Sequence, residues 1–276
     1  MKLDFLDQWI RQKYSGILSM LGVIGTFVFA FVDIKSGYKL FVGCITFVVF
    51  VLIYIIIWLY YKKQNSIRLK INNSEIEVKF GDIFAEDAEL KAIAFNEYFD
   101  TKVDNVIISE SSLNGQFINK YYAQNIQKLD EIIENDQHIH ENEVGKNETR
   151  VDGKKVKYRL GSVVVEGQYL LIAFSHFSND NKAYLGISDY ISCLLNFWNE
   201  VDRVYAGRTV VLPLLGSGIT RFKGYEGISD QELLELIIWT FKVSRIKFTY
   251  PAKAKIIIYP GKKDKINLLS LKKLEQ

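Results

Sequence analysis

The sequence predicts an α/β fold in which a two-helix transmembrane hairpin precedes a domain built on a mixed sheet. Two uncharged, apolar runs at residues 15–32 and 40–61 lie close together near the N-terminus. After residue 66, β-rich runs alternate with runs of helical spacing, a pattern typical of a sheet that helices cover on both faces. The order of these features divides the chain into a hairpin at 1–65 and one domain at 66–276, which is long enough to bury a sizeable core.

Charge and cysteine content argue against two common classes of protein. The net charge of +3 is too small to indicate a nucleic-acid partner. The two cysteines, Cys44 in the second apolar run and Cys193 in an expected helix, do not suggest a disulfide framework. A reduced, cytoplasmic setting is therefore expected for the domain.

Each apolar run has about the 20 residues that a helix needs to cross the hydrocarbon core of a bilayer. The polar segment Asp33–Lys39 between them is so short that the two helices must be antiparallel. Basic residues flank the hairpin, with Arg11 and Lys13 before the first run and Lys62 and Lys63 after the second. The positive-inside rule then places both termini and the domain in the cytoplasm, with the hairpin in the cell inner membrane.

Small residues recur on one face of the first run, at Ser15, Ser19, Gly22 and Thr26. Small side chains allow helix backbones to approach closely in lipid. The stripe therefore packs either against the second helix of the same hairpin or against another subunit, which would make the protein a homo-oligomer. No charged residue or histidine lies inside either run, so the usual signature of a selective ion path is missing.

Local patterns and turn residues predict the first elements of the domain. Strands at 67–71 and 75–80 flank a turn at Asn72-Asn73, and the run 106–108 is either a short strand or the approach to one. Helical spacing covers 115–134, and the polar stretch 135–149 indicates an exposed loop.

The second half of the domain alternates more regularly. A hairpin around Asp152-Gly153 is expected over 149–160, followed by strong strands at 162–165 and 169–174. The remaining elements are a helix at 189–205 capped by Ser188, a strand at 209–214, a helix at 229–243 opened by a capping box of Ser229 and Glu232, and a strand at 254–259.

The segment after the strand at 209–214 carries the most informative motif. Leu214-Leu215 is followed by Gly216-Ser217-Gly218. Two glycines around a serine allow backbone N–H groups to converge on one point and bind phosphate oxygens without a lysine. The motif also follows a strand, where open α/β sheets bind ligands. A plain turn is the alternative interpretation.

Two further segments could complete such a site. Gly81-Asp82-Ile83 directly follows a strand, where the aspartate could accept a hydrogen bond from an adenine amino group. A turn or helix-cap aspartate is the alternative. The run Ser109–Phe117 precedes a helix and forms either the opposite wall of a diphosphate cleft or an N-terminal cap with no ligand.

Together these segments resemble the macro domain, a three-layer α/β/α fold that binds ADP-ribose and its derivatives, and the resemblance covers about 67–259. Gly81-Asp82-Ile83 is similar to the family's motif whose aspartate holds the adenine. Ser109–Phe117 is similar to the first phosphate loop, with Gly115 alone of its glycines remaining. Leu212–Ile219 is similar to the second phosphate loop, and Phe222 has the position of an aromatic residue that packs on the distal ribose.

The resemblance implies a ligand site without catalytic residues or metal ligands and without a cofactor. Enzymatic macro domains carry an Asn-Ala-Ala-Asn motif followed by paired glycines, whereas this chain has Asn96–Asp100 and no glycine pair. The expectation is therefore a binding module. Its implied ligand-binding residues are Asp82, Ile83, Asn114, Gly115, Phe117, Leu215, Gly216, Ser217, Gly218, Ile219, Thr220 and Phe222.

A two-helix hairpin joined to a divergent macro domain is similar to the membrane effector of macro-domain-type Thoeris anti-phage defence. The resemblance implies a signal made from NAD by a separate TIR-domain enzyme, namely ADP-ribose conjugated to histidine. Binding of this histidine–ADP-ribose would lead the protein to oligomerise and disrupt the bilayer, ending in abortive infection. The alternative function is a membrane-tethered ADP-ribosyl or nucleotide hydrolase.

The three histidines offer little further chemistry. His138 and His140 lie among acidic residues, but without cysteine or a closed ligand set they indicate a solvated acidic loop rather than a metal site. His176 follows a strong strand and either lines the cleft or belongs to its rim or core.

Overall fold

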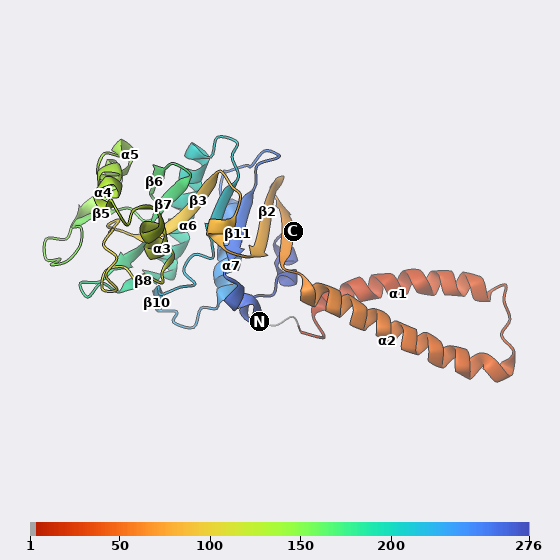
Figure 1. Cartoon of the computed structure of the whole chain (residues 1–276). Helices are drawn as coiled ribbons and strands as arrows, with labels where there is room; N and C mark the ends of the chain where they lie inside the picture. The colour runs from red at the N-terminus through yellow and green to blue at the C-terminus, as the bar shows by residue number, and fades with distance from the viewer. Residues whose placement is uncertain (1–3, 276) are drawn as a thin grey trace.

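The computed structural model describes residues 4–275 of the chain. Two long helices, α1 (Gln8–Phe29) and α2 (Lys39–Lys63), precede an α/β domain whose first strand, β1, spans Ser66–Ile71. The helices form an antiparallel pair that projects from the end of the domain where β1 and β2 (Ser74–Phe80) lie (Figure 1).

The two helices are tied together near the domain. The Tyr14 hydroxyl donates to the carbonyl oxygen of Phe50 at 3.2 Å. The ring of Phe5, which precedes α1, packs edge-on against Tyr54 and Trp58 of α2, with centroids 4.9 and 5.5 Å apart. At the far end, a short 3₁₀ turn at Ser36–Tyr38 leads into α2.

One helical segment among the described residues, Ser36–Lys63, is long and apolar enough by length and composition to cross a membrane. The expected first span at 15–32 differs from the structure, because α1 begins at Gln8 and ends at Phe29. Its first turns carry Arg11 and Lys13, so only its later part is apolar. The structure therefore provides one candidate span where the sequence predicted two.

The main sheet is mixed, as predicted, and its strands follow the order β1-β2-β11-β9-β3-β7-β8-β10, with β6 also paired to β7. Strands β2, β11, β9, β3 and β7 are mutually parallel neighbours, whereas β1, β6 and β8 pair antiparallel. Their bounds are β3 Leu90–Asn96, β6 Val163–Glu166, β7 Tyr169–Phe177, β8 Ala183–Gly186, β9 Val210–Pro213, β10 Arg221–Lys223 and β11 Ala254–Ile258.

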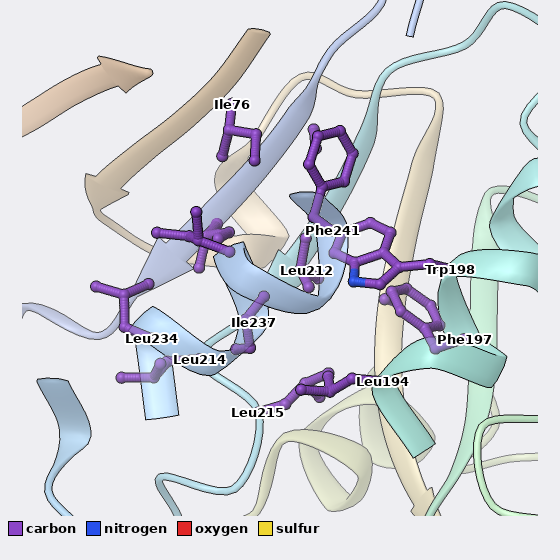
Figure 2. Close-up of a cluster of buried hydrophobic side chains, with 14 of the residues drawn as sticks. Ile76, Leu194, Phe197, Trp198, Leu212, Leu214, Leu215, Leu234, Ile237 and Phe241 are labelled. Carbon is purple, nitrogen blue, oxygen red and sulfur yellow. The ribbon is translucent and has the colours of Figure 1, made fainter. Parts of the chain in front are cut away.

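Helices cover both faces of this sheet because its side chains alternate between two hydrophobic clusters. Leu90 and Ala92 of β3 pack with α6 (Ile187–Val204) and α7 (Asp230–Val243). Ile93 and Phe95 of the same strand pack with α3 (Leu113–Tyr121) and α4 (Ile126–Glu134). The larger cluster joins strand residues such as Leu212 to helix residues such as Trp198 and Phe241 (Figure 2). The three-layer arrangement is thus the one that was expected.

The region 115–158 contains the largest differences from the sequence-based prediction. The expected helix over 115–134 is split into α3 and α4, because the Asn125 side chain accepts the N–H of Lys128 and starts a new helix. The expected loop contains α5 (Gln137–His140) and β4 (Glu143–Lys146). Strand β4 pairs with β5 (Val156–Tyr158). The loop between them covers 147–155 and is longer than the expected tight turn at Asp152-Gly153.

Other features of the structure confirm or correct predictions about single turns, helix caps and strands. Asn72 and Asn73 have φ of 50° and 65°, as a tight turn between β1 and β2 requires. The capping box of Ser229 and Glu232 is present at α7. In contrast, α6 is capped by Gly186, so the expected cap Ser188 lies inside the helix. The run 106–108 forms a single bridge through Ile108, and β8 and β10 were not predicted.

Replacing Phe241 by alanine should destabilise the domain by about 3–5 kcal/mol, because its ring is fully buried between Trp198 and Phe248. Urea unfolding of the protein in detergent, followed by circular dichroism, measures this loss. Trp239→Ala on the same helix is the control, since Trp239 is 45% exposed and its removal should cost far less. Equal losses in the two variants would contradict the assigned core.

Candidate functional site

The parallel strands bring several loops to one edge of the sheet. Because β2, β11, β9, β3 and β7 run in the same direction, the segments that follow them emerge at their common carboxyl edge. Gly81 follows β2, Glu97 follows β3, Leu214 follows β9 and Ser178 follows β7. Open α/β sheets bind ligands in the crevice at this edge.

The loop after β9 is a tight turn fixed by buried side chains. Leu214 and Leu215 are 5% and 2% exposed and anchor the loop in the core. The Ser217 N–H and hydroxyl both donate to the carbonyl oxygen of Leu214, at 3.3 and 2.7 Å. The Tyr190 hydroxyl of α6 donates to the carbonyl oxygen of Leu215 at 3.0 Å. The turn is therefore held from both sides before any ligand is present.

Gly216 lies at a position where any side chain would be strained. Its φ is +83°, and a Cβ there would lie 2.9 Å from Cζ of Phe222 and 3.4 Å from Cε2 of Tyr190. The two rings meet edge-on with centroids 5.4 Å apart. Gly218 has no atom within 4 Å of an equivalent Cβ, so its side faces open space. Gly216 thus allows the backbone to pack closely against the rings of Phe222 and Tyr190, and Gly218 leaves the backbone of the loop open to a ligand.

A cavity of about 770 Å³ opens at this loop. Five of the residues expected in the ligand site line it, namely Gly216, Ser217, Gly218, Thr220 and Phe222. The rest of the wall was not anticipated and contains Lys182 and Tyr184 from around β8, together with Lys223, Glu226 and Asp230. The one sequence signal for this wall was the polar run after β7, because the short strand β8 has no distinctive pattern.

The Gly81-Asp82-Ile83 segment lies at the same edge but outside this cavity. Ile83 is buried in a small cluster with Val211 of β9 and Ile257 of β11, against which Leu113 of α3 also packs. Asp82 is exposed, and its Oδ1 accepts the N–H of Phe84 at 2.9 Å. It therefore caps a short 3₁₀ turn, as the alternative interpretation stated, while Oδ2 accepts no hydrogen bond from residues 4–275.

The first phosphate-loop segment is shaped by its helix cap. Ser112 caps α3 and its Oγ accepts the N–H of Gly115 at 3.2 Å. A Cβ on Gly115 would lie 2.2 Å from the carbonyl oxygen of Ser109, so the chain needs glycine here for close approach. Asn114 Oδ1 accepts the Ser112 hydroxyl at 2.6 Å.

Of three further residues expected in the ligand site, two have buried side chains and one is exposed. The Phe117 side chain is fully buried and packs on Tyr169 at 4.7 Å, so it is a core residue rather than a contact for a ligand. The Leu215 side chain is buried as well, and only its backbone is part of the loop surface. Ile219 is 62% exposed beside Gly218.

Glu97 and His176 form a polar pair where β3 and β7 end. The Nδ1 of His176 donates to Glu97 Oε2 at 2.8 Å, and the Phe177 N–H donates to Oε1 at 3.2 Å. Burial raises the pKa of Glu97, but His176, Phe177 and Lys157 together outweigh it and hold the pKa below its usual range. Glu97 is therefore ionised at neutral pH. His176 is held by Glu97 and is not among the residues that line the cavity.

Asn96 ends β3 and begins the segment Asn96–Asp100, which lacks the asparagine motif expected of an enzymatic macro domain. Its Oδ1 accepts the N–H groups of Tyr98 and Asp100, and its Nδ2 donates to Asp100 Oδ2 at 2.7 Å. Asp100 is in turn paired with Arg150 at 2.6 Å, with both side chains 1% exposed. Both the oxygen and the nitrogen of the Asn96 amide thus take part in stabilising the loop after β3.

The other two histidines pair with carboxylates. His138 Nε2 lies 2.9 Å from Glu200, and His140 Nδ1 lies 2.6 Å from Glu143. Within residues 4–275, no group of three or more histidine, cysteine or acidic side chains is arranged to hold a metal ion.

Gly216→Ala should destabilise the domain by about 1–3 kcal/mol, because it combines left-handed backbone with a clash against Phe222. Thermal unfolding of the protein in detergent measures the change. Gly218→Ala is the matched control and should leave stability within about 0.5 kcal/mol of the wild type. A stable Gly216→Ala variant would contradict the described packing.

The Glu97 interactions should stabilise the domain in a pH-dependent manner. Since the folded pKa is lowered, the stabilisation is fully present above about pH 4.3, the ordinary value for glutamate. It is lost as pH falls through the lowered pKa. The difference in unfolding free energy between wild type and Glu97→Gln should therefore stay constant above about pH 5. It should become smaller as the pH is lowered from 5 toward 2. A difference that grows on acidification would refute this assignment.

Comparisons with known proteins agree on one family. The family model described as "Thoeris protein ThsA, Macro domain" matches residues 76–259. The Thoeris protein ThsA of Bacillus amyloliquefaciens (strain Y2) is 41% identical over 269 residues, which cover 96% of this chain and 89% of that protein.

Solved macrodomains show weaker similarity. A mutant macrodomain of Oceanobacillus iheyensis with ADPR has a TM-score of 0.48 and 12% identity, covering 76% of this chain and 96% of that one. The same macrodomain with ADP has a TM-score of 0.45 and 12% identity, covering 76% and 94%.

Proposed function

Because this chain belongs to the ThsA family of Thoeris proteins with a macro domain, we propose that it is a signal-gated membrane effector of anti-phage defence. In this proposal the cavity binds an ADP-ribose derivative, and the helix pair responds by disrupting the bilayer. The observation that carries the proposal is the pre-formed loop at Gly216–Gly218, which opens into the 770 Å³ cavity at the carboxyl edge of the sheet.

The loop suits a diphosphate. The backbone N–H groups of Gly216 and Gly218 provide neutral donors for its oxygens, whereas the Ser217 N–H is engaged by Leu214. Anion binding at these groups requires no buried cation. Asp82 Oδ2 would accept the adenine amino group, since the other oxygen of this carboxylate is engaged by Phe84. Phe222 presents its ring edge beside the loop, where the distal ribose would pack.

The preferred ligand in this proposal is histidine–ADP-ribose, supplied by a TIR-domain partner enzyme. The cavity is within the usual range for small-molecule sites, about 300–1,000 Å³. Its lining also includes Lys182, Tyr184 and Lys223, which provide both charged and aromatic surface. A group attached to the distal ribose would enter this region.

Binding without turnover is part of the proposal. The Asn96 oxygen accepts two hydrogen bonds and its nitrogen donates one within the same loop, which directs the amide toward its own loop rather than toward a substrate. Incubation of the protein with ADP-ribosylated substrates should therefore release no product. Measurable hydrolysis would favour the alternative, a tethered ADP-ribosyl or nucleotide hydrolase.

The helix pair is proposed to lie in the inner membrane as a hairpin. Large apolar side chains are exposed along both helices, among them Val23 and Phe27 of α1 and Phe47 and Ile56 of α2. Such a surface is unfavourable in water and is covered by lipid tails instead. Lys62 and Lys63 lie at the domain end of α2 and support an orientation in which that end, both termini and the domain are cytoplasmic.

Assembly is proposed to involve the stripe of small residues on α1. Ser15, Ser19, Gly22 and Thr26 are all exposed, so α2 of the same chain does not cover them. The hydroxyls of Ser19 and Thr26 donate to carbonyl oxygens one turn earlier, at 2.9 and 2.8 Å. A face without unsatisfied donors can pack closely against the same face of another subunit.

Calorimetry on the full-length protein in detergent tests ligand binding, with ADP-ribose and histidine–ADP-ribose as ligands. Asp82→Asn should weaken both by about 10-fold, because an asparagine retains the cap to Phe84 but places an amide against the adenine amino group. Asp87→Asn, on an exposed aspartate nearby, should bind like the wild type. If the folded wild type bound neither ligand, the proposed function would fail.

A further inference from the structure

A series of hydrogen bonds connects the wall of the cavity, through the first turn of α7, to the start of α1. The Lys262 ammonium donates to the carbonyl oxygen of Ser217, in the loop after β9, and to both carboxyl oxygens of Asp230, at 2.9 and 3.1 Å. Asp230 is the first residue of α7 and lines the cavity together with Ser217. Lys262 and Asp230 are 21% and 9% exposed, so this ion pair is largely shielded from water. Lys262 therefore ties the phosphate loop to the start of α7.

The series continues from α7 to the helix pair. Gln231 Oε1 accepts the backbone N–H of Asn267 at 2.8 Å. The Asn267 Nδ2 then donates to Asp7 Oδ2, also at 2.8 Å. Asp7 caps α1, because its other carboxyl oxygen accepts the N–H of Trp9 at 2.9 Å. Gln231 and Asn267 are 8% and 3% exposed, so the loss of these bonds would leave buried polar groups unsatisfied.

An anion bound in the loop would interact directly with the ammonium group of Lys262. An ammonium group has three donors and no acceptor, and here they are directed at Ser217 and Asp230. A diphosphate on the N–H groups of Gly216 and Gly218 brings negative charge beside the same ammonium. It then competes with Asp230 for Lys262, so ligand binding and the Lys262–Asp230 ion pair oppose each other.

We propose that these bonds, the Ser217–Asp7 relay, couple occupancy of the phosphate loop to the hold of the domain on α1. A bound diphosphate draws Lys262 from Asp230, relaxes the first turn of α7 and weakens the bond between Asn267 and Asp7. The relay rests on the proposed function, since it requires a phosphate ligand at the loop. By linkage, weakening the bond at Asp7 must in turn favour the ligand.

The bond between Asp7 and Asn267 can be broken and rebuilt without removing either residue's local hydrogen bonds. Asp7→Asn keeps an oxygen for the N–H of Trp9 but opposes two amide groups. Asn267→Asp keeps an oxygen for the N–H groups of Leu269 and Ser270 but opposes two carboxylates. The double variant restores one donor and one acceptor, with the net charge of the wild type.

The first readout is the affinity of the full-length protein in lipid nanodiscs for ADP-ribose, measured by calorimetry. Each single variant should bind at least about fivefold more tightly than wild type, and the double variant should return to the wild-type affinity. Asp4→Asn is the matched control, since Asp4 is exposed and outside the relay, and it should bind like the wild type. Equal affinities in all variants would overturn the relay and leave the proposed function standing.

The second readout needs no ligand and separates the relay from the proposed function. Hydrogen exchange of the amides in 214–220 should be faster in both single variants than in wild type and normal in the double variant, because loosening at Asp7 reaches the loop through Lys262. Unchanged exchange in the single variants overturns the relay, whether or not the wild type binds ADP-ribose. Absence of ADP-ribose binding by the wild type, in contrast, refutes the proposed function.

Discussion

The contact of Gly216 with the rings of Phe222 and Tyr190 determines the shape of the site. Phe222 belongs to β10 at the edge of the sheet, and Tyr190 belongs to α6 in one of the helical layers. The glycine lets the backbone pass within contact distance of both rings, so the loop is clamped between a strand and a helix. Its N–H groups are thereby fixed in position, and an anion that binds them need not order the loop.

The same region also joins the domain to the helix pair. Helix α7 packs in the core through residues such as Phe241, and its first turn meets both Lys262 and Asn267. Helix α2 is linked to β1 covalently through Gln64 and Asn65, whereas α1 is held to the domain by the bond between Asp7 and Asn267. A perturbation at the loop therefore has a short route, through partly buried polar contacts, to the cap of α1.

Local signals in the sequence predicted much of the fold. The turn at Asn72-Asn73 and the capping box at Ser229 were identified because each is determined by a few neighbouring residues. The mixed sheet followed from the alternation of strands and helices. The break between α3 and α4 was missed, because the capping preference of Asn125 competes with helical spacing that continues on both sides.

The site was predicted less completely, for a physical reason. Strands β8 and β10 are only four and three residues long, which is too short for an alternating pattern, and β10 is held by pairing with the distant β8. The polar run after β7 was therefore the one local signal for the cavity wall at Tyr184. Phe117 has the same sequence surroundings whether its ring faces a ligand or the core, and only the packing on Tyr169 decides. The motif at Gly216–Gly218 was recognisable because the left-handed backbone at Gly216 favours a glycine there.

Ligand-triggered leakage of a bilayer is the most direct test of a signal-gated membrane effector. The full-length protein would be reconstituted into vesicles of bacterial inner-membrane lipid loaded with a self-quenching dye. Histidine–ADP-ribose should release the dye in a dose-dependent manner, with little release in its absence and none from vesicles without protein. Equal leakage with and without the ligand, or intact vesicles at ligand concentrations that saturate the protein, would contradict the account.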